Sequence, residues 1–332
     1  MRSSENERPA IGLDIGTSRI VVAEQSGEQY RFDAQLNAFV TIPYSKITEN
    51  VLKKEGVPHV VRGAEIVVHG NESERFADLL NVETRRPMTR GILNPTEPDS
   101  VGLLKDMITS MTRGKEGAKV CFSVPAPQLG SDDSQSYHEA TIRELLTQLG
   151  FEVTSINEGL AVVYSELESS NYTGVGISLG GGLCNVCVSY LSVPALSFSI
   201  GKAGDYIDSS AANATGELAT RIRITKEASF AFNEHQNDKL HQVISVYYDE
   251  VIRGVVAALK ETFASTRSMP RIGRPIPMVL SGGSAMPRGF RERFEKLLKD
   301  SDFPVPLSEI RLAERPLYAT AKGALVSALA EM

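Results

Sequence analysis

Residues 173–190 read Thr-Gly-Val-Gly-Ile-Ser-Leu-Gly-Gly-Gly-Leu-Cys-Asn-Val-Cys-Val-Ser-Tyr. An apolar run ends near Ser178, glycines occupy positions 180–182, and a second apolar run continues to Tyr190. This pattern predicts two strands joined by a glycine hairpin. Because glycine has no Cβ and tolerates positive φ angles, such a turn can direct backbone N–H groups into one concavity, where a phosphate fits.

The hairpin has a second copy near the start of the chain. Residues 11–16 (Ile-Gly-Leu-Asp-Ile-Gly) align with residues 175–180 (Val-Gly-Ile-Ser-Leu-Gly), so that Asp14 falls on Ser178 and the glycines at 12 and 16 fall on those at 176 and 180. A repeat at about half the chain length predicts two related domains that face each other. The two hairpins could then hold one polyphosphate from opposite sides of a cleft.

Composition sets the broad class of the protein. The 332 residues suffice for two domains with cores of their own. The net charge is −6, and no basic stripe suits a nucleic acid. Three cysteines do not make a disulfide framework, which favours a reducing compartment. Since the sequence has neither a signal-peptide pattern nor an apolar run of transmembrane length, we expect a cytoplasmic protein without direct membrane insertion.

Apolar runs typical of strands alternate with segments of helical periodicity. We expect helices over residues 101–112, 139–150, 158–167, 204–232 and 240–263, and strands over residues 119–124, 152–156, 196–200 and 277–280. Residues 38–43 are expected to continue the first sheet, and Pro287 to lie in the first turn of a helix. The alternation predicts an α/β protein whose mixed, largely parallel sheets carry helices on their faces.

Several familiar catalytic motifs are missing from the sequence. It contains no Gly-x-x-x-x-Gly-Lys-Ser/Thr, no His-Glu-x-x-His and no credible zinc cluster. Its five histidines are scattered, which argues against histidine catalysis. What remains is a set of glycine turns, at residue 16, at residues 180–182 and at residues 282–283.

These turns lie in segments that resemble motifs of the actin, Hsp70 and sugar-kinase superfamily. Residues 12–19 (Gly-Leu-Asp-Ile-Gly-Thr-Ser-Arg) resemble its first phosphate motif, residues 177–186 its second phosphate motif, and residues 279–289 its adenosine motif. Residues 156–161 and 316–324 are similar to its two connecting helices. All occur in the family's order, so the resemblance spans nearly the whole chain.

Within the superfamily, the chain is most similar in size to the bacterial actins of the MreB and MamK type. Residues 61–65 and 86–92 also resemble segments of that group. The resemblance implies an actin-like (ribonuclease H-like) fold with duplicated domains and a nucleotide cleft between them. Domain I would comprise residues 1–157 with a small inserted subdomain at about 35–85, domain II residues 158–310, and a C-terminal helix at 311–332 would return to domain I.

The resemblance also implies a function. Bacterial actins of this type are cytoskeletal proteins that bind ATP or ADP with Mg²⁺, assemble into filaments and hydrolyse ATP weakly. The partners implied are further copies of the chain and a cytoplasmic adaptor.

Roles carry over position by position. Asp14 would hold Mg²⁺ through water, because Mg²⁺ keeps several waters and takes few carboxylates. Glu158 would orient the attacking water, since phosphoryl transfer depends on positioning and electrostatic stabilisation. Lys226 would approach the base or ribose. The remaining cofactor-binding positions are Gly16, Thr17, Ser18, Gly180, Gly181, Gly182, Leu183 and Gly204 around the phosphates, and Gly282, Gly283, Ser284 and Met286 against the adenosine.

Three positions depart from the family's pattern. Ser178 replaces an aspartate that normally helps to bind the metal-bound water, Leu183 replaces a threonine, and Gly159 replaces a proline. A serine offers no negative charge to Mg²⁺. We therefore expect nucleotide binding to be retained and hydrolysis to be impaired.

Two other functions stay open at this point. One is a non-polymerising nucleotide-binding scaffold or adaptor that does not hydrolyse ATP, and Ser178 and Leu183 favour this lack of hydrolysis. The other is a small-molecule kinase of the same superfamily, which would need an acidic base for its acceptor hydroxyl that we cannot assign from the sequence.

Overall fold

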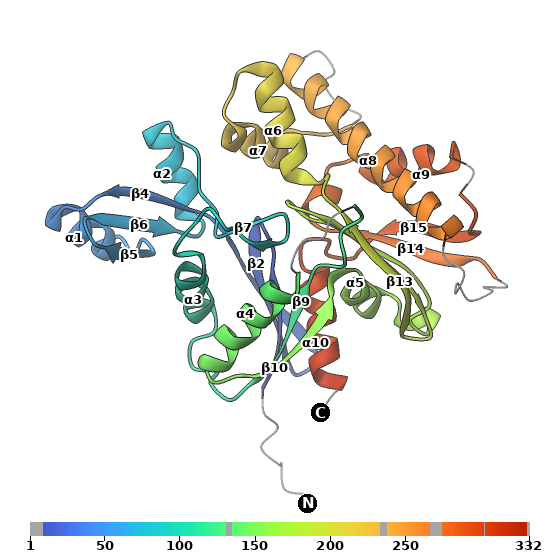
Figure 1. Ribbon diagram of the computed structural model, residues 1–332, viewed down its shortest axis with the longest axis horizontal. Coiled ribbons are helices and arrows are strands. Elements are labelled where there is room, and N and C mark those ends of the chain that lie inside the picture. The colour runs from blue at the N-terminus through green and yellow to red at the C-terminus, as the bar shows by residue number, and fades with distance from the viewer. Residues whose placement is uncertain (1–8, 131–134, 233–237, 266–273, 302, 331–332) are drawn as a thin grey trace, which may run out of the picture.

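The computed structural model describes residues 9–130, 135–232, 238–265, 274–301 and 303–330. Two five-stranded sheets organise them (Figure 1). The first has the order β10-β9-β1-β2-β3, built from β1 (Ala10–Ile15), β2 (Arg19–Ser26), β3 (Gln29–Leu36), β9 (Lys119–Val124) and β10 (Glu152–Asn157). The second has the order β13-β12-β11-β14-β15, built from β11 (Gly174–Leu179), β12 (Cys184–Tyr190), β13 (Val193–Ile200), β14 (Ile276–Ser281) and β15 (Leu307–Leu312).

The two sheets repeat one topology. In each, the first three strands form an antiparallel meander, and the next two strands extend it in parallel from the first strand. The predicted duplication is therefore confirmed. The expectation of largely parallel sheets is wrong, because in each sheet the meander contributes two antiparallel strand pairs, as many as there are parallel pairs.

The repeated glycines have a packing role. A Cβ at Gly12 would lie 2.0 Å from the carbonyl oxygen of Ala321 in α10 (Ala319–Ala330), and a Cβ at Gly176 would lie 2.4 Å from that of Gly159 in α5 (Glu158–Glu166). Each sheet thus receives one helix in backbone contact with its first strand. Helices α5 and α10 also touch each other between the sheets (Figure 1), since a Cβ at Gly323 would lie 1.7 Å from the oxygen of Ala161.

An inserted subdomain follows β3. It consists of a three-stranded sheet of order β4-β6-β5 with two helices: β4 (Phe39–Pro43), α1 (Lys46–Lys54), β5 (His59–Arg62), β6 (Glu65–His69) and α2 (Glu72–Leu80). Residues 38–43 therefore do not continue the first sheet as expected. They pair with β6 because Val40 packs with Leu52, Ile66 and Val68 in a separate small core.

The remaining helices cover the sheets. They are α3 (Ser100–Met111) and α4 (Gln135–Gln148) on the first sheet, and α6 (Gly204–Thr215), α7 (Ala219–Ser229), α8 (Lys239–Ser265) and α9 (Phe290–Lys299) beside the second, with a small hairpin of β7 (Met88–Thr89) and β8 (Ile92–Leu93). The predicted helix over residues 240–263 is confirmed. The helix expected over 204–232 is two helices, because Gly216 takes a left-handed φ of 79°.

Another local prediction fails at the start of α9. That helix begins at Phe290 after Gly289, whose φ is 83°, so Pro287 lies in the preceding turn and not in the first helical turn. The domain boundaries at residues 157 and 310 stay predictions. Within the described ranges, no helix combines the length and apolarity needed to cross a membrane.

Candidate functional site

A cavity of about 360 Å³ lies where the ends of the two sheets face each other. Every site residue proposed from the sequence lines it. These residues are Asp14, Gly16, Thr17, Ser18, Glu158, Gly180, Gly181, Gly182, Leu183, Gly204, Lys226, Gly282, Gly283, Ser284 and Met286. Positions that are far apart in the sequence thus meet in one place, although their roles stay predictions.

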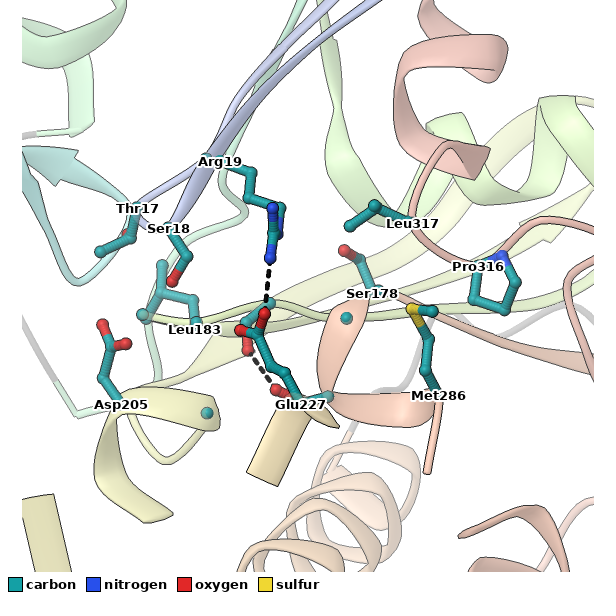
Figure 2. Close-up of a pocket in the computed structure, with 18 of the residues that line it drawn as sticks. Thr17, Ser18, Arg19, Ser178, Leu183, Asp205, Glu227, Met286, Pro316 and Leu317 are labelled. Atoms are coloured by element: carbon teal, nitrogen blue, oxygen red, sulfur yellow. Dashed lines mark hydrogen bonds and ion pairs between the residues drawn. The ribbon is translucent and has the colours of Figure 1, made fainter. Parts of the chain in front are cut away.

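The two phosphate-type turns touch across the cavity. A Cβ at Gly181 would lie 2.0 Å from Ser18 Oγ, and a Cβ at Gly182 would lie 2.4 Å from Thr17 Oγ1. Figure 2 shows Thr17 and Ser18 above Leu183 and Asp205, on the left of the view. Any side chain at these glycines would fill the space between the turns, so the backbone itself forms this wall.

Two half-buried carboxylates of the site come from the ends of two elements. Asp14 lies in β1 and accepts a hydrogen bond of 2.7 Å from Ser123 Oγ. Glu158 opens α5, and its Oε2 accepts hydrogen bonds from Ser178 Oγ at 3.3 Å and Asn185 Nδ2 at 2.9 Å. Ser178 and Asn185 lie directly opposite each other in the β11–β12 hairpin, so this cross-strand pair holds the glutamate.

Burial raises the pKa of both carboxyl groups. At Asp14 the hydrogen bond from Ser123 opposes this effect. At Glu158 the negative charge of Asp14 adds to burial, and the bonds from Ser178 and Asn185 oppose it. The neighbouring negative charges favour a cation between them.

The donor chemistry fits a hydrated Mg²⁺. Across the described ranges, the groups that lower the pKa of Asp14 and Glu158 are neutral side chains and not Lys or Arg, and no cluster of three or more His, Cys, Asp or Glu side chains could enclose a metal. Mg²⁺ binds through one or two carboxylates and keeps several waters. The two carboxylates therefore suit an ion whose remaining ligands are water and phosphate.

The positions that depart from the family's pattern have clear contacts. Ser178 donates to Glu158, as described above. Leu183 is buried, and its Cδ1 would lie 2.5 Å from a Cβ at Gly91. Leucine at this position therefore packs against the turn between β7 and β8, where a threonine would offer a hydroxyl.

Lys226 does not extend freely into the cavity. Its Nζ lies 2.6 Å from Asp208 Oδ1 and donates to the oxygen of Gly204 at 3.3 Å, and both ion-pair partners are buried. Burial raises the pKa of Asp208, and the charge of Lys226 opposes this effect. The ion pair thus holds Lys226 against α6.

Sequence reasoning missed the charged residues that link the two sides of the cavity. Arg19 NH2 lies 2.5 Å from Glu227 Oε2 across the opening, as the dashed line in Figure 2 shows. Arg86 NH1 lies 2.6 Å from Asp205 Oδ1 and also donates to Ser18 Oγ at 3.2 Å. Three of these residues lay close to a sequence signal, because Arg19 ends the segment 12–19, Arg86 begins the segment 86–92 and Asp205 directly follows the predicted Gly204.

The far wall of the cavity is less polar. Figure 2 shows Met286, Pro316 and Leu317 together on one side. Gly282 takes a φ of 92°, which glycine readily adopts, and its N–H donates to the oxygen of Pro316 at 2.9 Å. This wall offers apolar side chains that a planar ring could contact, beside the polar turns.

Comparison with solved structures identifies the fold. The MamK double helical filament matches with a TM-score of 0.71 and 17% identity over 98% of this chain and 99% of that chain. MreB 5 of Spiroplasma citri bound to AMPPNP matches with a TM-score of 0.64 and 14% identity over 96% of this chain and 95% of that chain. The ethanolamine utilization protein EutJ from Carboxydothermus hydrogenoformans matches with a TM-score of 0.56 and 16% identity over 98% of this chain and 91% of that chain.

At these identities the matches establish the fold, which is actin-like, as the sequence predicted. No curated protein sequence matches the chain significantly. The sequence model of the Volactin family matches residues 10–328. Since this match covers nearly the whole chain, the protein belongs to the Volactin family and has the actin-like fold of MamK and MreB.

Proposed function

We propose that this chain is a cytoskeletal protein that binds ATP or ADP with Mg²⁺ in the cavity, assembles with copies of itself into filaments, and hydrolyses ATP slowly. The observation that carries the proposal is the convergence of two glycine turns and of the half-buried carboxylates of Asp14 and Glu158 on one cavity between duplicated sheets. Structures of the same fold supply independent support, because one holds AMPPNP and another ADP.

Each part of the cavity has a proposed role. The backbone of residues 16–18 and 180–182 would surround the phosphates, and Gly282, Gly283, Ser284 and Met286 would contact the adenosine. Asp14 would hold Mg²⁺ through water, and the ion would neutralise phosphate charge. Glu158 would accept a hydrogen bond from the attacking water. Lys226, held by Asp208, would contribute positive charge near the base or ribose.

Slow hydrolysis follows from the serine at position 178. Its hydroxyl donates to Glu158, so it adds no negative charge for the metal and its waters. Glu158 already accepts two hydrogen bonds at Oε2, which leaves that oxygen less free to accept a further hydrogen bond from the attacking water. Both effects retain nucleotide binding and weaken the chemical step.

Self-assembly is proposed from the MamK filament, which this chain matches over nearly its full length. The proposed site of action is the cytoplasm, with an adaptor as a further partner. The alternative is a non-polymerising nucleotide-binding scaffold that does not hydrolyse ATP, and Ser178 favours this lack of hydrolysis. A kinase is disfavoured, because the other cavity carboxylates, Asp205, Asp208 and Glu227, are each ion-paired.

The test is sedimentation of the purified chain with and without Mg-ATP, with phosphate release measured in the same tubes. We expect nucleotide-dependent pelleting and slow phosphate release. The variant D14N should lose the response to Mg-ATP, whereas D33N, at an exposed position of β3, should retain it. Protein that binds ATP but stays in the supernatant under all nucleotide and salt conditions would support the scaffold instead, and protein that binds no ATP would refute both.

A further inference from the structure

Helix α7 begins without a capping side chain of its own. The residue at its N-cap position is Leu218, whose side chain makes no cap hydrogen bond. The first N–H groups of any helix lack partners within the helix. Here they are satisfied from the other side of the cleft: Glu83 Oε1 accepts from Ala219 N at 2.7 Å, and Glu83 Oε2 accepts from Thr220 N at 3.0 Å.

Glu83 belongs to the segment that leaves the inserted subdomain after α2. Its carboxylate also accepts from the hydroxyl of Thr220, and the neighbouring Thr84 N–H donates to that hydroxyl at 3.3 Å. A carboxylate at a helix N-terminus is favoured by the partial positive charge there. The bidentate contact therefore replaces the side-chain cap that Leu218 lacks.

A second carboxylate from the subdomain meets the same helix one turn later. Arg223 donates to Glu74 Oε1 from NH2 at 2.5 Å and from Nε at 3.0 Å. The side chain of Arg223 is only 4% exposed, so its charge depends on this partner. Glu74 comes from α2 and Glu83 from the segment after it, so the inserted subdomain holds α7 at two successive points.

The residues that follow on α7 reach the cavity. Arg223, Lys226 and Glu227 all line it, and their spacing places them on one face of the helix. A helix of 11 residues has little stability of its own, so an uncapped first turn frays. Fraying would move Arg223 directly and loosen the following turn that carries the other two residues.

We infer that Glu83 and Glu74 are positioning residues for the nucleotide site: the inserted subdomain caps α7 in trans, and this contact sets the affinity of the cavity for nucleotide. The nucleotide as ligand rests on the proposed function, whereas the capping of α7 by Glu83 does not depend on it. It makes closure of the subdomain onto α7 and nucleotide binding mutually supporting events.

The experiment compares E83A with wild type in the full chain. Amide hydrogen exchange is measured over residues 219–227, and the affinity for Mg-ATP is measured by calorimetry. We expect exchange in α7 to become about fivefold faster and ATP to bind about fivefold more weakly, which corresponds to the loss of one helix cap. E83Q, which retains one acceptor oxygen, should show a smaller effect. E55A, at an exposed position of the same subdomain, should change neither quantity.

A rescue variant distinguishes the cap from general damage. Leu218 has the extended backbone (φ −72°, ψ 139°) of an N-cap residue, so L218S can supply a local hydroxyl cap. In the E83A background, L218S is expected to restore slow exchange in α7 and most of the ATP affinity. Unchanged exchange and affinity in E83A, or no rescue by L218S, would overturn the inference. If wild type binds no ATP, the proposed function fails. Hydrogen exchange in E83A and its rescue by L218S still test whether Glu83 caps α7.

Discussion

The amide of Asn185 donates a hydrogen bond of 2.9 Å from Nδ2 to Oε2 of Glu158. The other end of the same amide is held as well, because Asn185 Oδ1 accepts the N–H of Ala126 at 2.8 Å. Asn185 is fully buried, so this pair of bonds determines which way its amide points. The glutamate proposed to orient water is thereby tied to the second hairpin and to the loop that follows β9.

Removing this amide is expected to destabilise the fold. N185A leaves the Ala126 N–H without its acceptor and removes a donor from Glu158. We expect the free energy of unfolding to fall by about 3 kcal/mol, because buried groups that lose their partners cost about 1–3 kcal/mol each. Urea denaturation measures this. N213A, at an exposed position of α6, should change stability by less than about 0.5 kcal/mol, and equal effects of the two variants would contradict the account.

Aspartate at position 178 should make stability depend on Mg²⁺. S178D places a third carboxylate beside Glu158 and Asp14, where Ser178 now donates a hydrogen bond. In EDTA we expect a loss of about 3 kcal/mol, the usual scale for an uncompensated buried charge. Mg²⁺ should restore much of that loss in thermal unfolding and should increase phosphate release from ATP. S178A is the matched control. If Mg²⁺ does not change the melting temperature of S178D, that result would argue against a metal at Asp14.

The contact between α5 and α10 predicts opposite effects for two helical glycines. G323A puts a methyl group 1.7 Å from the oxygen of Ala161, so the helices must separate, and we expect a loss of about 3 kcal/mol or more. Gly254 lies in α8, where a Cβ would have Ile200 Cδ1 as its nearest neighbour, at 4.0 Å. G254A should therefore stabilise the protein by about 0.5–1 kcal/mol through helix propensity. Chemical denaturation of both variants tests the pair, and similar effects would refute the close packing.

Acid should destabilise the protein through His138. Burial in α4 lowers the pKa of this histidine from 6.5 to about 4. Because the folded pKa lies below the unfolded value, protons bind preferentially to the unfolded chain, so the stability that the neutral ring contributes is present above pH 6.5 and is lost as the pH falls toward 4. Between pH 7.5 and pH 5 the loss amounts to about 2 kcal/mol. H138L should remove that part of the acid dependence, and parallel stability curves for wild type and H138L would contradict the prediction.

The fold could be predicted because its decisive features are local. The glycine turns and the strands around them repeat in the sequence, and the same repeat places Gly12 and Gly176 where helices approach the sheets. Apart from Glu158, Gly204 and Lys226, the proposed site residues lie in or beside these turns, and all of them line the cavity. Predictions failed where an alternative partner decided the outcome, as for residues 38–43, which pack in the core of the inserted subdomain.

The sequence by itself determined the duplicated α/β architecture, the turns that meet at the cavity and the serine in place of an aspartate. These follow from residue types and short-range spacing, which local backbone geometry constrains. Only the tertiary structure decided which charges pair across the cleft. Glu83 meets α7 across 136 positions of sequence and Arg19 meets Glu227 across 208, so no local pattern records either contact. Such contacts form only when the two halves of the chain come together, because an ion pair depends on distance in space and not on position in the chain.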